Sequence, residues 1–142
     1  MGLLEDYTTG IGMPRPTREH QIVMSYLHVN LCNELMPKGL RPLTESPVTD
    51  DLNDKVPDLV VFDSNYKQLF LIIEIATHRD CKKTIHKCDE LMERFPQIEC
   101  FVYDYEANVW YTFDAEANEW YNSAEYEIQS RYLEHPLPFY LG

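Results

Sequence analysis

The sequence of 142 residues has little positive charge: 12 Lys and Arg stand against 24 Asp and Glu, a formal net charge of −12 at pH 7. A polyanion repels nucleic-acid phosphates, so strong non-specific binding to DNA is disfavoured. The charge is uneven, because residues 79–87 hold four basic residues and one acidic residue. By contrast, residues 104–142 hold eight acidic residues and one basic residue. The sequence therefore predicts one small basic region on an acidic protein.

Long apolar runs are also missing, since none approaches the roughly 20 residues of a membrane-spanning helix. The first residues, MGLLEDYTTG, are acidic where a signal peptide would be basic. The four cysteines form no CxxC pair, and Cys81 and Cys88 would lie two helical turns apart, beyond disulfide reach. We therefore expect reduced thiols, no membrane segment and a cytoplasmic location.

The length fits a single domain with one hydrophobic core. Residues 1–13 show no hydrophobic periodicity and hold three of the five glycines, which indicates a flexible arm. We expect a core over residues 14–113 and a C-terminal extension over residues 114–142.

Two helices are expected from apolar spacing and from their end signals. Thr17 can cap the first helix, and Pro37 with Gly39 can end it. The second helix is expected over residues 80–95, with Pro96 closing it. Their apolar stripes are Val23, Leu27, Leu31 and Leu35 in the first helix, and Cys81, Ile85, Cys88, Leu91, Met92 and Phe95 in the second.

Strands are expected where β-branched apolar residues cluster between turn residues. The runs over residues 59–62 and 69–76 predict a hairpin, and residues 43–46 predict a short edge strand. Further along, DYEANVWY recurs after ten residues as DAEANEWY, which is typical of a β-meander. The expected meander strands are residues 98–105, 109–114 and 119–122.

The predicted hairpin places two carboxylates together. A loop centred on Tyr66 pairs Asp58 with Glu74, Val60 with Ile72, and Phe62 with Phe70. Carboxylates opposite each other on paired strands lie about 5 Å apart at Cβ and repel unless a cation neutralises them. Hard cations prefer such oxygen ligands. Alternatively, both acids lie in solvent at the end of the sheet and bind nothing.

These residues resemble the PD-(D/E)xK restriction-endonuclease-like superfamily, through Pro57-Asp58 and then Glu74-Ile75-Ala76 between apolar strands. The resemblance spans residues 14–113 and implies an α/β fold, with a mixed β-sheet flanked by helices in the order α-β-β-β-α-β. The motifs most similar to a branch of small bacterial predicted endonucleases expanded in cyanobacteria are PTREHQIV, PDLVVFD, EIATHRD and FVYD.

The resemblance implies a Mg²⁺ or Mn²⁺ ion held by Asp58, Glu74 and the backbone carbonyl of Ile75. Ala76 stands where the superfamily lysine would be. In the resembled branch this lysine often comes from the following helix, and Lys87 matches that position best.

Glu19 and His20 on the first helix are further candidates for the site, and the resemblance implies that His20 contacts phosphate or metal-bound water. The implied activity is metal-dependent hydrolysis of phosphodiester bonds in DNA. The alternative is an inactive nuclease-fold domain that acts as a protein-binding or regulatory module, which the acidity and Ala76 favour.

Two other groups of residues could form a site or an interface. His78, Cys81, His86 and Cys88 are soft ligands close in sequence, but His86 and Cys88 would be about 200° apart on a helix, which argues against zinc. The aromatic residues of the meander suit either a homodimer contact or ordinary core packing; they are Trp110, Tyr111, Trp120 and Tyr121.

Overall fold

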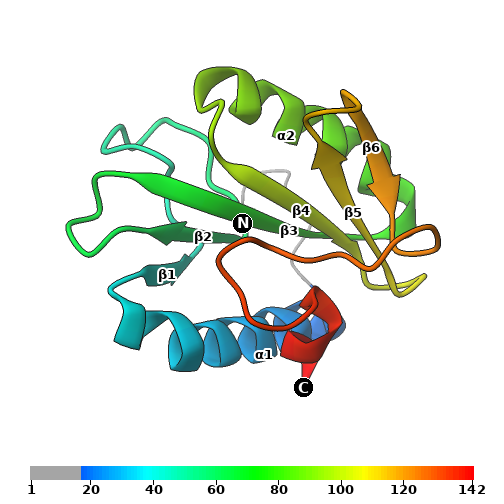
Figure 1. Cartoon of the computed structure of the whole chain (residues 1–142), viewed down its shortest axis with the longest axis horizontal. Helices are drawn as coiled ribbons and strands as arrows, with labels where there is room; N and C mark the ends of the chain where they lie inside the picture. Colours follow the sequence, from blue (N-terminus) through cyan, green and yellow to red (C-terminus); the bar gives the residue numbers. More distant parts are fainter. Residues whose placement is uncertain (1–16) are drawn as a thin grey trace, which may run out of the picture.

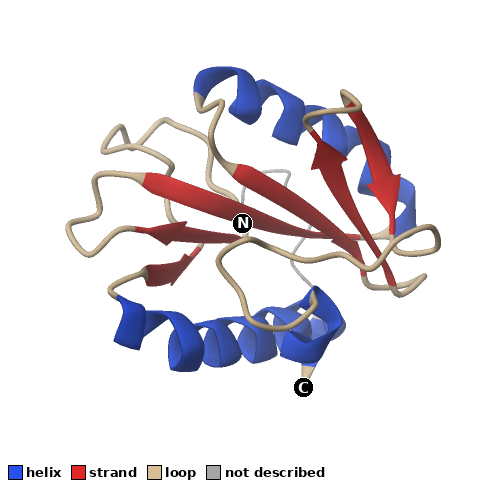
Figure 2. Cartoon of the chain, in the orientation of Figure 1, coloured by secondary structure: helices blue, strands red, loops and turns tan. Residues whose placement is uncertain are grey.

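The computed structural model describes residues 17–142, so the arm predicted over residues 1–13 lies outside the described part of the chain. A six-stranded sheet has helix α1 (Arg18–Leu35) on one face and helix α2 (Cys81–Arg94) on the other (Figure 1). Figure 2 shows the resulting three layers, with strands between helices. The predicted α/β class is confirmed. None of the helices within residues 17–142 combines the length and the apolar character needed to cross a membrane.

The strands lie in the sheet in chain order, and only the central pair, β3 and β4, is parallel. This arrangement confirms the predicted mixed sheet, including the meander. The strands are β1 (Arg41–Thr44), β2 (Leu59–Phe62), β3 (Leu69–Ala76), β4 (Glu99–Asp104), β5 (Val109–Asp114) and β6 (Glu119–Asn122).

Helix α1 begins and ends at the predicted signals. The Thr17 hydroxyl accepts a hydrogen bond from the backbone N–H of His20 at 3.0 Å, which caps the first turn. After Leu35 a 3-10 turn ends at Gly39, whose φ of 84° is a conformation that glycine adopts without strain. The strand β1 starts two residues earlier than predicted and includes Pro42, which an edge strand tolerates because the missing N–H is not needed for pairing.

The predicted register of the β2–β3 hairpin is confirmed next to the carboxylates and wrong at the turn. Val60 pairs with Ile72 as predicted. Phe62 pairs with Leu69 rather than with Phe70, because the register shifts between Val61 and Phe62. The irregularity lies at the turn end of the hairpin, so the end that carries Asp58 keeps the predicted alignment.

The repeat in the meander has a physical cause. Asp104 Oδ1 accepts hydrogen bonds from the backbone N–H groups two and three residues later, and Asp114 Oδ1 does the same in the next turn. Asn108 and Asn118 each adopt φ 56°, which asparagine tolerates better than most residues. Each copy of the repeat is therefore one turn followed by one strand.

The sheet buries both of its faces. Side chains beneath α1 form one apolar cluster, whereas those beneath α2 form another. Trp110 is buried in the first cluster and stacks on Tyr103, while Trp120 lies against the second and donates from Nε1 to Asp89 at 2.8 Å. The predicted aromatic residues of the meander thus pack as core, and the homodimer stays a prediction.

The C-terminal segment covers the part of the sheet next to α1, and in Figure 1 it ends beside that helix. Leu137 and Tyr140 are buried in the α1-side cluster. Asn30 of α1 donates to the Tyr140 carbonyl at 3.0 Å, and the Tyr140 hydroxyl donates to Glu34. The C-terminal extension is therefore part of the hydrophobic core.

This packing predicts that Leu137→Ala lowers the free energy of unfolding by about 2–5 kcal/mol, because it leaves a cavity at a fully buried site. The matched control is Phe139→Ala, two residues away, where the side chain is 57% exposed and little change is expected. Urea unfolding followed by circular dichroism measures both. Equal, small losses would show that the extension does not contribute to the core.

Candidate metal and phosphate site

Asp58 and Glu74 meet at the end of the β2–β3 hairpin. The backbone N–H of Asp58 donates to Glu74 Oε1 at 2.8 Å, and the backbone N–H of Ile75 donates to Asp58 Oδ2 at 2.8 Å. Glu74 is only 3% exposed, since β3 is an inner strand of the sheet. Each carboxylate is thus fixed by the backbone beside the other.

Lys87 reaches this pair from helix α2. Its Nζ lies 2.6 Å from Glu74 Oε2, and the side chain is about one-third exposed. Lys87 can contact Glu74 because it lies at the edge of the apolar face of α2. On that face Cys88 and Leu91 are buried against the sheet. The structure therefore brings the ammonium group of Lys87 together with Asp58 and Glu74, as the sequence predicted.

The environment of Glu74 shifts its pKa upward. Burial raises the pKa of Glu74, and the nearby Asp58 charge raises it further, against the lowering effect of Lys87. The Lys87 ammonium is the main influence that favours the ionised form of Glu74. Loss of that partner would leave a buried charge without compensation.

His20 approaches Asp58 from the other face of the sheet. Its Nε2 lies 3.4 Å from Asp58 Oδ1, and this contact is the main cause that raises the pKa of His20. Burial acts to raise the pKa of Asp58, but the contact with His20 and the Ile75 N–H outweigh it and hold that pKa below its ordinary value. His20 Nδ1 is buried, and within residues 17–142 it has no hydrogen-bond partner.

Glu19, the remaining candidate, is not brought to the site. It is exposed on α1, and none of the hydrogen bonds or ion pairs among residues 17–142 involves its carboxylate. Adjacent helical residues point about 100° apart, so the turn that aims His20 inward aims Glu19 outward.

The donors at the site fit a small hard cation. Asp58, Glu74 and the Ile75 carbonyl would hold it, and all three supply oxygen, the ligand type that Mg²⁺ and Mn²⁺ prefer. In the described part of the chain no cluster of three or more His, Cys, Asp or Glu side chains is arranged to hold a metal. Two carboxylates plus a carbonyl, with solvent or substrate completing the shell, agree with the way Mg²⁺ is usually bound.

The four soft ligands considered for zinc do not converge. The His86 side chain is exposed toward Glu90, whereas Cys88 is fully buried in the core beneath α2. His78 instead contacts a residue that the sequence analysis did not single out, Asp104 at the end of β4, with Nδ1 2.6 Å from Oδ2. The sequence signals for that residue were the FVYD motif, which ends at Asp104, and the repeat DYEANVWY, which begins there.

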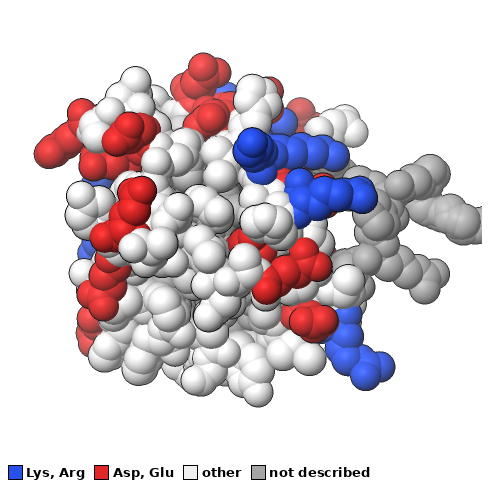
Figure 3. All heavy atoms as spheres, turned by 90° about the vertical axis from the view of Figure 1, so that its right-hand side faces the viewer, with Lys and Arg blue, Asp and Glu red and all other residues white. Residues whose placement is uncertain are grey.

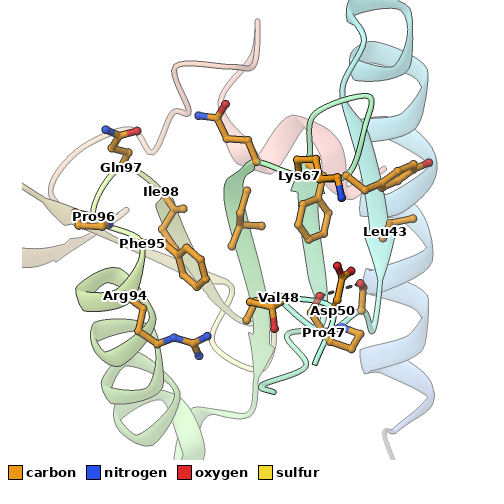
Figure 4. Close-up of a pocket in the computed structure, with 16 residues that line it drawn as sticks. Leu43, Pro47, Val48, Asp50, Lys67, Arg94, Phe95, Pro96, Gln97 and Ile98 are labelled. Carbon is orange, nitrogen blue, oxygen red and sulfur yellow. Dashed lines mark hydrogen bonds between the residues drawn. The ribbon is translucent and has the colours of Figure 1, made fainter. Parts of the chain in front are cut away.

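A cavity of about 590 Å³ lies at the other end of the strands, away from the carboxylates. Figure 4 shows Phe95, Ile98 and Val48 along its wall, together with Arg94. The Arg94 guanidinium forms two hydrogen bonds with Asp54, at 2.7 and 2.8 Å. None of the predicted site residues lines this cavity.

The chain is similar in structure to a known protein but not in sequence to any family model or curated protein that was compared. Among solved structures the chain is similar to a protein of Anabaena variabilis described as "a putative nuclease belonging to DUF820", with a TM-score of 0.67 and 13% identity over 90% of this chain and 83% of that chain. The two proteins share one fold. At this identity the likeness concerns the backbone arrangement.

The Lys87–Glu74 pair predicts a pH-dependent stability defect. Because the pKa of Glu74 is raised in the folded state, its contribution to stability falls as pH rises from the unfolded pKa through the folded one. Lys87→Met would raise that pKa further. We expect a loss of about 1–3 kcal/mol at pH 8, discounted for the exposure of Lys87, and a smaller loss at pH 5, because protonation of Glu74 removes the charge that the cation compensates.

Urea unfolding of the wild type and Lys87→Met at the two pH values measures this difference. Lys83→Met is the matched control, since Lys83 is exposed one turn earlier on α2. A Lys87→Met defect of the same size at pH 5 and pH 8 would contradict the ion-pair account and indicate lost packing instead.

Proposed function

We propose that this protein is a metal-dependent nuclease that hydrolyses phosphodiester bonds of DNA. The observation that carries the proposal is the Lys87 Nζ–Glu74 Oε2 contact of 2.6 Å beside Asp58. Two acids and a lysine from three separate segments meet at the end of the sheet, and this is the residue set expected for phosphodiester hydrolysis.

A bound divalent cation would polarise the scissile phosphate and lower the pKa of a water to supply the nucleophile. The protein residues have distinct tasks in this proposal. Asp58 and Glu74 hold the cation, with their orientations fixed by the two backbone hydrogen bonds. Lys87 stabilises negative charge that develops on the phosphate oxygens and orients the water. His20 balances the charge of Asp58 from the α1 side.

The missing superfamily lysine is the main argument for an inactive domain. Ala76 occupies its place in β3, but Lys87 brings an ammonium group to Glu74 from α2. The position of a lysine side chain, rather than its place in the sequence, determines whether it can serve in catalysis. This geometry favours activity over a regulatory role.

Two further observations agree with the proposal. The structurally similar Anabaena protein is described as a putative nuclease, and we extend that description to this chain as part of the proposal. All four cysteines are free thiols, three of them buried, which agrees with the reducing cytoplasm, where we place the activity.

Nicking of supercoiled plasmid in the presence of Mg²⁺ or Mn²⁺ tests the function, with calorimetric titration of Mn²⁺ in parallel. We expect Asp58→Ala to lose both metal binding and nicking. Lys87→Ala should lose nicking by about 10²-fold or more, because it removes charge stabilisation in the transition state, while it still binds metal.

The matched control is Asp63→Ala, which removes a carboxylate from the other end of β2, where Asp63 accepts hydrogen bonds only within the turn. It should bind metal and nick DNA like the wild type. Metal binding without nicking by the wild type would favour the inactive domain, whereas equal nicking by the wild type and Asp58→Ala would contradict the proposed site.

A further inference from the structure

A second acid-base pair lies where the central parallel strands end. His78 is in a 3-10 turn, His78–Asp80, directly after β3, and Asp104 is the last residue of β4. The His78 Nδ1 and Asp104 Oδ2 atoms are 2.6 Å apart. Asp104 is fully buried, whereas the His78 side chain is 72% exposed. A buried carboxylate thus holds an exposed imidazole.

The contacts around Asp104 fix the orientation of this ring. Burial acts to raise the pKa of Asp104, but hydrogen bonds from Ala107 N–H, His78 and Glu106 N–H outweigh it and keep that pKa below its ordinary value. An ionised carboxylate can only accept, so Nδ1 of His78 carries a proton. The His78 backbone N–H also donates to Glu106 Oε1 at 2.9 Å. Because Nδ1 contacts Asp104, Nε2 is the ring nitrogen that is left for contact with a ligand.

The turn after β4 explains the hydrogen bonds that Asp104 Oδ1 accepts from backbone N–H groups, but it does not require the contact of Oδ2 with the exposed His78 ring. An exposed histidine needs no buried carboxylate to keep it folded, and burying a charge is costly unless it is paired. Carboxylates that hold a histidine by Nδ1 commonly serve to orient Nε2 toward a ligand. The geometry is that of a histidine prepared for contact with an anion or a reacting group.

His78 lies close to the proposed catalytic site. Ala76 pairs with Asp104 across the parallel strands, and Glu74 is two residues before Ala76. His78 is four positions after Glu74, so their Cα atoms are at most about 14 Å apart. A nucleic-acid strand advances about 3.4 Å per nucleotide, and His78 is thus within roughly four nucleotides of a phosphate held at Glu74.

The positive charge near His78 is also available for binding. Lys82 and Lys83 are exposed at the start of α2, and within residues 17–142 neither forms an ion pair. Most other basic side chains in the described part are paired with acids, as Arg94 is with Asp54 and Lys55 with Glu90. Figure 3 shows lysine and arginine side chains gathered toward one side of a face whose remainder carries scattered acids.

We propose that His78, oriented by Asp104, binds a backbone phosphate of the nucleic-acid substrate within a few nucleotides of the scissile bond, with Lys82 and Lys83 flanking it. The inference rests on the proposed nuclease function and assigns its substrate-binding surface. With a proton on each ring nitrogen, His78 would donate to the Asp104 carboxylate from Nδ1 and to a phosphate from Nε2. Contacts of this kind place the strand without reading its sequence.

Equilibrium binding of a fluorescent DNA duplex and of a single strand, in metal-free buffer, measures this surface by anisotropy. We expect His78→Ala to weaken binding about 3- to 10-fold, as for loss of one partly exposed charge-assisted hydrogen bond. Lys82→Ala and Lys83→Ala should each reduce the slope of log affinity against log salt by about 1. In cleavage with Mg²⁺, His78→Ala should raise KM with little change in kcat.

His86→Ala is the matched control, since the His86 side chain is 77% exposed on the same helix and faces Glu90. It should bind and cleave like the wild type. Asp104→Asn is expected to weaken binding in the same direction as His78→Ala; should it fail to fold, the His78 and lysine variants still test the inference.

Different results would contradict the inferred phosphate contact of His78 and the proposed nuclease activity. Cleavage and binding that are unchanged in His78→Ala and in the lysine variants would overturn the inference while leaving the nuclease activity. Binding that depends on His78 in a wild-type protein that does not cleave would contradict the nuclease activity and support the inference. A wild-type protein that binds neither probe overturns the inference.

Discussion

The buried carboxyl group of Glu74 in an inner strand is the constraint on which the site depends. A buried carboxylate is tolerated only with compensation, and here the compensation comes from the backbone N–H of Asp58 and the ammonium of Lys87. The hydrogen bond from Asp58 requires the observed β2–β3 register. The contact with Lys87 requires α2 to pack on the face of the sheet opposite α1. The same interactions that make the fold acceptable therefore assemble the proposed catalytic residues.

The two faces of the sheet contribute differently. The α2 face supplies Lys87 and, through the turn that leads into the helix, His78 with its buried partner Asp104. The α1 face supplies His20, whose position is fixed by the Thr17 cap of that helix. The meander contributes side chains to the apolar clusters on both faces, and the C-terminal segment packs on the α1 face. Lys82, Lys83 and Lys87 thus supply positive charge at the end of the sheet where a phosphate chain is proposed to bind.

Much of this arrangement could be predicted from sequence because it depends on local periodicity. The symmetric hairpin aligned Asp58 with Glu74, and the helical phase of α2 placed Lys87 beside the core stripe. The shift at Phe62 could not be seen, because it depends on the turn, where Tyr66 adopts φ 58°. The pairing of His78 with Asp104 was missed since it joins residues 26 apart, which only the parallel contact of β3 with β4 brings together.

Crystals soaked with Mn²⁺ offer the most direct test of the central claim, that Asp58 and Glu74 share one divalent cation. Anomalous scattering would locate the ion without reference to activity. The account predicts a single strong peak within bonding distance of both carboxylates and of the Ile75 carbonyl, at about 2.0–2.3 Å. Manganese bound elsewhere, with Lys87 and His20 still in contact with the two acids, would contradict it.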